Sequence, residues 1–209
     1  MDSEVTAVLA RYDQRAEREL ALMQAMAPDE MMQHVDEFLI SIGPETGTLL
    51  NVLIKSLQAP TVLEIGTSYG HSTIFLAEAA RASHGKVISL DVSADKQKFA
   101  REQLGEAGLG AFVEFITGDA REVIASLPGP FDFVLIDLWK DLYIPCFDLV
   151  YPKLSDGAFV AADNILFPDL FRDAMVAYRK HVRGHAGIDS VLLPVGSGIE
   201  LSRYSRENA

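Results

Sequence analysis

The sequence has little cysteine and few basic residues. Cys146 is the one cysteine among 209 residues, which excludes an intrachain disulfide and a cysteine-based zinc site and favours a reducing compartment. Only 18 Lys and Arg stand against 30 Asp and Glu, so the formal net charge is −12. This charge disfavours nucleic acid and anionic membrane surfaces as partners, because both are bound through basic faces.

Long hydrophobic runs are also missing. The most apolar stretches, such as residues 131–136, have the length of a strand and fall far below the ~20 residues of a membrane span. The first residues are acidic, and no apolar run of the kind found in signal peptides follows them, so we expect a cytoplasmic protein without membrane contact. The chain also lacks a G-x-S-x-G nucleophile elbow and a phosphate-binding G-x-x-x-x-G-K-[ST] loop.

The sequence contains enough apolar residues, 49%, for one folded domain spanning 1–209. Helical periodicity fills residues 1–43, with a break at Pro28, and we expect this part to form a helical cap. From residue 44, predicted helices alternate with strands, which indicates an α/β core with a mostly parallel sheet and helices on both faces. Seven strands are expected, the last two as an antiparallel hairpin: 61–65, 86–91, 112–117, 131–137, 157–162, 190–194 and 199–204.

A glycine loop follows the first predicted strand, where ligands bind in open parallel sheets. Gly66 allows a tight turn and close approach of a ligand, and Glu64 before it can meet an ammonium group. Ser72 lies at the start of the next helix, and Asp91 closes the second strand, where a carboxylate can bind ribose hydroxyls. Asp119 can accept a hydrogen bond from an adenine amino group or cap the following helix. These features suit a nucleoside joined to a zwitterion, as in S-adenosylmethionine, better than a dinucleotide.

Acidic and amide side chains follow the fourth and fifth predicted strands. Asp137 ends one strand, with Lys140 three residues later, and Asp163 and Asn164 end the next. Two carboxylates and one amide oxygen are ligands typical of Mg²⁺, or of Mn²⁺ or Ca²⁺. The alternative is that the aspartates only cap loops and that Lys140 pairs with a neighbouring acid such as Asp141.

The segments 137–143 (DLWKDLY) and 163–168 (DNILFP) resemble catechol O-methyltransferase. Residues from about 40 to 204 are similar to its bacterial relatives and to those of caffeoyl-CoA O-methyltransferase, which are cation-dependent. The resemblance implies a Rossmann-like methyltransferase fold, S-adenosylmethionine as methyl donor, and a divalent metal held by Asp137, Asp163 and Asn164. It further implies that Lys140 is the general base.

The same resemblance assigns the remaining site residues. Pro168 would line the substrate pocket, although it also suits a simple helix start. Trp139 would pack on the adenine, although a tryptophan here also suits the core. The chain departs from catechol O-methyltransferase at Leu138, where that family carries a histidine, and at Ala120, where a serine contacts the cofactor. The implied cofactor contacts are Glu64, Gly66, Ser72, Asp91, Asp119, Ala120, Asp137 and Trp139.

The function expected is methyl transfer to a hydroxyl of a small phenol with vicinal hydroxyls. Three alternatives remain: methylation of an amine or single hydroxyl with the metal incidental, a nicotinamide-dependent oxidoreductase, and a non-catalytic binding protein. The oxidoreductase is disfavoured because the loop lacks the later glycines of G-x-G-x-x-G.

We expect the N-terminal helices to cap the substrate, and they are also a candidate homodimer contact. The five histidines show no spacing that we interpret as a metal site.

Overall fold

A seven-stranded sheet forms the centre of the computed structural model, which describes residues 1–208 apart from the side chains of residues 28, 32 and 208. The strand order is β3-β2-β1-β4-β5-β7-β6. Strand β7 runs antiparallel to both of its neighbours, and the other six strands are parallel. The predicted fold class is therefore confirmed. The strands are β1 (Thr61–Ile65), β2 (Lys86–Asp91), β3 (Val113–Thr117), β4 (Phe131–Ile136), β5 (Leu154–Ala162), β6 (Ile188–Leu193) and β7 (Ile199–Tyr204).

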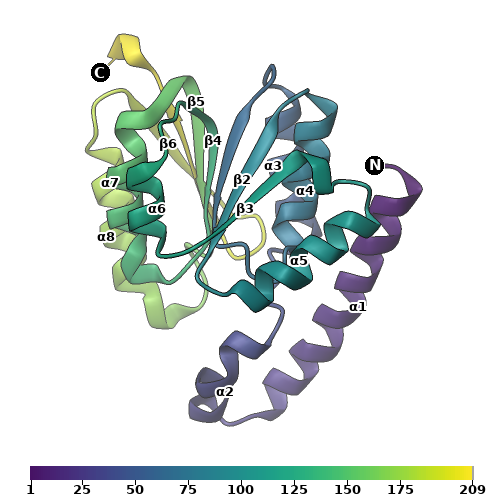
Figure 1. Cartoon of the computed structure of the whole chain (residues 1–209). Helices are drawn as coiled ribbons and strands as arrows, with labels where there is room; N and C mark the ends of the chain where they lie inside the picture. The colour runs from purple at the N-terminus through teal and green to yellow at the C-terminus, as the bar shows by residue number, and fades with distance from the viewer. Residues whose placement is uncertain (209) are drawn as a thin grey trace.

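Helices cover both faces of the sheet (Figure 1). Helices α6, α7 and α8 lie on one face, and α3, α4 and α5 lie on the other, with α1 outside them. Each face has its own apolar core, because strands such as β4 are buried on both sides. The helices are α1 (Ser3–Ala25), α2 (Pro28–His34), α3 (Pro44–Lys55), α4 (His71–Ala82), α5 (Ala94–Glu106), α6 (Ala120–Ser126), α7 (Tyr143–Val150) and α8 (Arg172–Arg183). Short 3₁₀ turns are η1 (Val35–Glu37), η2 (Gly110–Phe112), η3 (Lys140–Leu142), η4 (Tyr151–Lys153), η5 (Asp169–Phe171) and η6 (Arg206–Asn208).

The N-terminal helix α1 packs through a narrow apolar stripe. Asp2 caps it by accepting the Val5 N–H, and Val5, Val8 and Tyr12 are buried against the α4 and α5 side of the sheet. Tyr12 also donates its hydroxyl proton to the carbonyl of Tyr69 in the glycine loop, at 2.6 Å. The N-terminal helices thus reach the loop after β1, while their role as a substrate cap stays a prediction. Among residues 1–208 no helix is long and apolar enough to cross a membrane.

The carboxyl ends of β1, β4 and β5 meet at one edge of the sheet, because these parallel strands are neighbours. The strand order reverses between β1 and β4, and that is where α/β sheets bind ligands. The strand boundaries agree with the pattern to within one residue, except that β5 and β6 start three and two residues early. Strand β5 begins at Leu154, three residues before Gly157, whose φ of +81° lies inside the strand near a register irregularity against β4. A glycine within a strand marks such an irregularity rather than the strand's start.

Candidate active site

The glycine loop after β1 is held tightly between its neighbouring strands. Gly66 has a φ of +110°, and a Cβ there would lie 1.9 Å from the carbonyl oxygen of Asp137. The N–H groups of Gly66 and Thr67 both donate to the carbonyl of Leu90, each at 2.9 Å. Glycine is therefore required at position 66 both for its backbone angles and for the close approach of β4.

Glu64 is fully buried beneath this loop. Its two carboxylate oxygens accept hydrogen bonds from Ser72 at 2.6 Å, from Thr73 at 2.7 Å and from the hydroxyl of Ser89. Burial raises the pKa of Glu64 to about 7, against the opposing effect of these three hydroxyls. Because the three hydroxyls are neutral donors, they leave the negative charge of an ionised Glu64 without a positive partner. The arrangement therefore suits a cationic ligand.

Thr73 and Ser89 did not emerge from the sequence as partners of Glu64. Thr73 lies one residue beyond the predicted Ser72, in the first turn of α4, while Ser89 comes from the middle of β2 and faces Glu64 across the parallel pair. A polar residue in an otherwise apolar strand is the signal that could have identified Ser89.

Asp91 lies at the end of β2, as predicted. It accepts backbone hydrogen bonds from Ser68 at 2.7 Å and from Ser93 at 2.8 Å, one to each oxygen. Asp91 is thus part of the loop's own architecture. Each carboxylate oxygen has a second lone pair, so these bonds leave capacity for a ligand's hydroxyls.

Asp119 is the N-cap of α6, which is the alternative role that the sequence allowed. It caps α6 by accepting the N–H of Arg121 at 2.8 Å, and it forms an ion pair with the same guanidinium at 2.6 Å. Hydrogen bonding to Arg121 lowers the pKa of Asp119 to about 2. Ala120 follows as the first, buried residue of α6. A contact of either residue with adenine stays a prediction.

Trp139 and Pro168 flank the edge of the sheet near the acidic cluster. Trp139 is 46% exposed, so its alternative role as an ordinary core residue is wrong. Pro168 is half-buried and precedes η5, next to the exposed side chains of Leu166 and Phe167. Trp139, Leu166 and Phe167 thus expose apolar surface in the loops that follow β4 and β5.

Lys140 connects the ends of β4 and β5. Its ammonium group donates to the amide oxygen of Asn164 at 2.8 Å, to the hydroxyl of Tyr143 at 2.6 Å and to the carbonyl of Leu138 at 3.1 Å. Its ion pair is with Asp137, at 3.8 Å. Asn164 has a φ of +55°, a left-handed conformation that asparagine adopts more readily than most residues. The structure therefore brings Asp137, Lys140 and Asn164 together as the sequence predicted.

Asp163, directly after β5, is the fourth member of this cluster. It is buried, and its Oδ1 atom has no hydrogen-bond partner within the described part of the chain. Burial, together with the charge of Asp137, raises the pKa of Asp163 to about 7. Burial also raises the pKa of Asp137 and lowers that of Lys140, although the two aspartates oppose the latter effect. Tyr143, which sequence reasoning missed, donates its hydroxyl to the Asp163 carbonyl at 3.1 Å and so anchors the loop.

These donor atoms fit a hard divalent cation. An unpartnered buried carboxylate oxygen is costly in a protein interior, and a cation is one of the few groups that satisfies it. Asp137, Asp163 and Asn164 offer only oxygen atoms, which is the chemistry that Mg²⁺, Mn²⁺ and Ca²⁺ share.

Comparison with known proteins identifies the family to which this site belongs. The O-methyltransferase family matches residues 14–205, nearly the whole chain. The protein therefore belongs to the O-methyltransferase family, as the resemblance of its motifs implied.

Several named proteins are similar to this chain. The chain is 33% identical over 131 residues to a catechol O-methyltransferase of Niastella koreensis, covering 61% of this chain and 59% of that protein. It is 27% identical over 186 residues to caffeoyl-CoA O-methyltransferase 5 of Nicotiana tabacum, covering 79% of this chain and 77% of that protein. The O-methyltransferase TomG from Streptomyces achromogenes, solved in complex with SAM, has the same fold with a TM-score of 0.75 at 24% identity. That similarity covers 98% of this chain and 91% of TomG.

Proposed function

We propose that the protein transfers a methyl group from S-adenosylmethionine to a hydroxyl of a small phenol with vicinal hydroxyls. The observation that carries this proposal is the cluster at the ends of β4 and β5. There the Lys140 ammonium contacts Asn164 at 2.8 Å, beside Asp137 and the unpartnered Oδ1 of Asp163. This cluster combines a cation site with a titratable lysine, and O-methylation of a phenol requires both an ionised oxygen and an acceptor for its proton.

The methyl donor is proposed to lie over the glycine loop. The buried carboxylate of Glu64 would hold the donor's ammonium group, with Ser72 fixing the carboxylate from α4. Gly66 lets the ligand approach the backbone, and Asp91 at the end of β2 would accept from the ribose hydroxyls. Asp119, Ala120 and Trp139 are proposed to surround the adenine.

Lys140 is the proposed general base. A phenol with a pKa of ~10 is about 0.1% ionised near neutral pH, so its proton must be removed before or during transfer. When bound to Asp137, Asp163 and Asn164, a divalent cation would stabilise the phenolate and so lower the substrate's pKa. Burial already lowers the pKa of Lys140, which increases its neutral fraction and so its capacity to take the proton. The oxygen then forms its bond to the methyl carbon as the bond from sulfur breaks, leaving S-adenosylhomocysteine and a methyl ether.

A second candidate keeps the methyl donor but methylates an amine or a single hydroxyl, with the metal incidental. The three oxygen donors at one sheet edge favour the first candidate, because such a set has no task in a reaction that needs no cation. We propose that the N-terminal helices of residues 1–43 form the cap over a small substrate, whose pocket Pro168 would help to enclose. The same helices are the candidate homodimer contact.

A methyl-transfer assay over a panel of catechols, single phenols and amines tests the proposal. Turnover of catechols that disappears with a chelator and returns with Mg²⁺ supports it, and the methylated position can be read from the product. The matched variants are Asp163→Ala, at the proposed metal ligand, and Asp169→Ala, an exposed aspartate in the nearby turn η5 that pairs with Arg172. Chelator-resistant activity in Asp163→Ala would refute the metal role, and turnover restricted to amines would favour the second candidate.

A further inference from the structure

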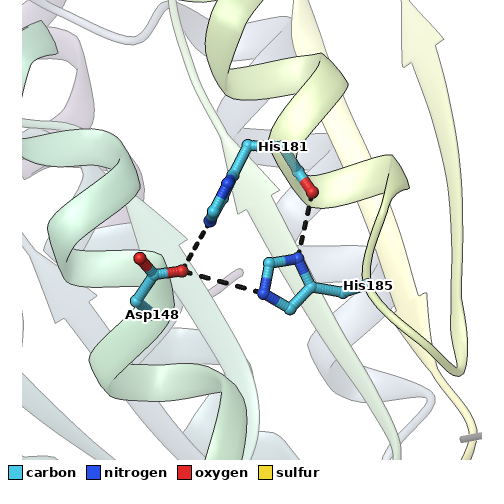
Figure 2. A group of neighbouring side chains, drawn as sticks. All are labelled: Asp148, His181 and His185. Atoms are coloured by element: carbon cyan, nitrogen blue, oxygen red, sulfur yellow. Dashed lines mark hydrogen bonds and ion pairs between the residues drawn. The ribbon is translucent and has the colours of Figure 1, made fainter.

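Two histidines and an aspartate meet on the surface formed by α7 and the end of α8 (Figure 2). We call Asp148, His181 and His185 the histidine triad. The Nε2 atom of His181 lies 2.6 Å from Oδ1 of Asp148, and Nε2 of His185 lies 3.7 Å from the same oxygen. One ligand atom from each residue lies within 4.8 Å of the others. The spacing of the two histidines alone did not indicate a site, because the third member comes from another helix.

The hydrogen bonding of His185 orients its Nε2 atom toward the carboxylate of Asp148. Its Nδ1 lies 3.0 Å from the carbonyl oxygen of His181, and a carbonyl can only accept, so Nδ1 carries the proton. In the neutral ring Nε2 then presents a lone pair toward the Asp148 carboxylate, which also presents lone pairs. A positive charge at this point, from a proton or from a metal ion, removes the repulsion between the two lone pairs. A ring whose Nδ1–H is held by a backbone carbonyl while Nε2 is free is also the usual form of a metal-binding histidine.

Neighbouring groups hold the triad in place. His185 packs edge-on against Phe147 and Tyr151, with ring centroids 5.0 Å and 4.7 Å away. Tyr151 donates its hydroxyl to the carbonyl of Ala186, which fixes the turn that carries His185. His181 lies in the last turn of α8, where the helix dipole favours a positive charge. The three side chains are therefore held close together before any ion binds. Binding of a metal releases to solvent the proton that lies between Nε2 of His181 and the Asp148 carboxylate.

We propose that the histidine triad binds a divalent transition-metal ion of the zinc class. Two imidazole nitrogens and one carboxylate oxygen suit Zn²⁺, Co²⁺, Ni²⁺ or Cu²⁺ rather than Mg²⁺. Three protein ligands leave at least one position open, and both histidines line an open depression of about 650 Å³ that admits water or a further ligand. The bound ion joins α7 to the end of α8. These helices follow the two loops that carry Lys140 and Asn164, so occupancy of the triad stiffens the frame behind the proposed active site.

Metal titration of the whole protein tests this site separately from the proposed active-site cation. Zn²⁺ is titrated by calorimetry into protein kept in excess Mg²⁺, and Tm is followed in parallel. We expect a zinc site that His181→Ala and Asp148→Asn both lose. At a Zn²⁺ concentration 100-fold above Kd, we expect Tm to rise by about 5–10 °C in the wild type and to stay constant in the variants. Bound Co²⁺ should give the intense visible absorption of a low-coordinate site with nitrogen ligands, in place of the weak bands of an all-oxygen octahedral site.

The chain provides a matched control. His34 forms an exposed pair with Glu37 at 2.8 Å, which also joins one imidazole to one carboxylate but lacks the second histidine. His34→Ala should leave the zinc stoichiometry and the Tm shift unchanged. The proposal is overturned if His181→Ala and Asp148→Asn bind as much Zn²⁺ as the wild type, or if all the zinc binding disappears in Asp163→Asn. Because none of these measurements uses turnover, failure of the triad and failure of the proposed methyl transfer are distinguishable.

Discussion

The substitution Glu64→Gln should increase the stability of the donor-free protein while weakening the binding of the methyl donor. Burial raises the pKa of Glu64 from 4.5 to about 7. A carboxyl group with a raised pKa binds its proton more tightly in the folded state than in the unfolded state. The stability that it contributes is complete below pH 4.5 and is lost as the pH rises through 7. At ~1.36 kcal/mol per pKa unit, this difference corresponds to about 3 kcal/mol above neutral pH.

Glutamine avoids this loss because it has nearly the same shape and carries no charge. Its amide can bond to the hydroxyls of Ser72, Thr73 and Ser89, which rotate to donate or accept. Urea unfolding at a series of pH values should show the wild type losing about 3 kcal/mol relative to the variant between pH 4.5 and pH 8. The buried Asp163 titrates in the same range, but it is present in both proteins and cancels in the difference.

Donor binding should change in the opposite direction. Loss of the carboxylate that pairs with the donor's ammonium group should weaken the Kd for S-adenosylmethionine by roughly 30- to 150-fold, or about 2–3 kcal/mol. Calorimetry measures this change, and Glu102→Gln on the exposed side of α5 removes the same charge as a control. If the free energies of unfolding of the wild type and Glu64→Gln change in parallel with pH, burial does not raise the pKa of Glu64. An unchanged Kd would refute its proposed contact with the ammonium group.

Three further substitutions or conditions test other parts of the site. Lys140→Ala should lower kcat by about 10²- to 10⁴-fold while the Kd for S-adenosylmethionine stays within about twofold, and a parallel loss of binding would contradict its role as base. Gly66→Ala should destabilise the protein by about 3 kcal/mol or more in urea unfolding, because the added Cβ would lie 1.9 Å from the Asp137 carbonyl oxygen. The apparent affinity for Mg²⁺ should increase from about pH 6 to pH 8, since Asp163, with its pKa raised to about 7, must lose its proton to act as a ligand. A pH-independent affinity in equilibrium titrations would contradict that assignment.

Much of the fold could be predicted because local pattern and tertiary position agree. Strand β4 is a nearly all-apolar segment buried on both faces, and β1 and β2 have boundaries identical to those expected. The prediction was less accurate at the starts of β5 and β6. Strand β5 begins three residues earlier than expected because Gly157 lies inside it. Strand β6 is only half-buried and starts at Ile188, two residues earlier than expected, because an edge strand lacks the continuous apolar signal of a central one.

The active-site cluster was predictable because parallel strands bring their carboxyl ends to the same edge. Asp137 and Asp163 follow neighbouring strands, so topology alone places them together. Other contacts in and around the site were not predictable in this way. Tyr143, which lies between Lys140 and the Asp163 carbonyl, and Ser89, which donates to Glu64, depend on side-chain direction. The histidine triad depends on how α7 and α8 pack, which no spacing within one segment reveals.

If a cation binds to Asp137, Asp163 and Asn164 as proposed, its binding and the deprotonation of Lys140 would be electrostatically linked. Its ammonium already donates to Asn164, which is also a proposed ligand, and its charge faces Asp137. A second positive charge at the same oxygens would repel the ammonium and lower its pKa further, because like charges favour the neutral form of lysine. The two aspartates oppose the effect of burial and raise the pKa of Lys140, so a cation that neutralises them would lower it. Lys140 would thus become neutral, and able to accept the phenol's proton, only when the cation that stabilises the phenolate is also bound.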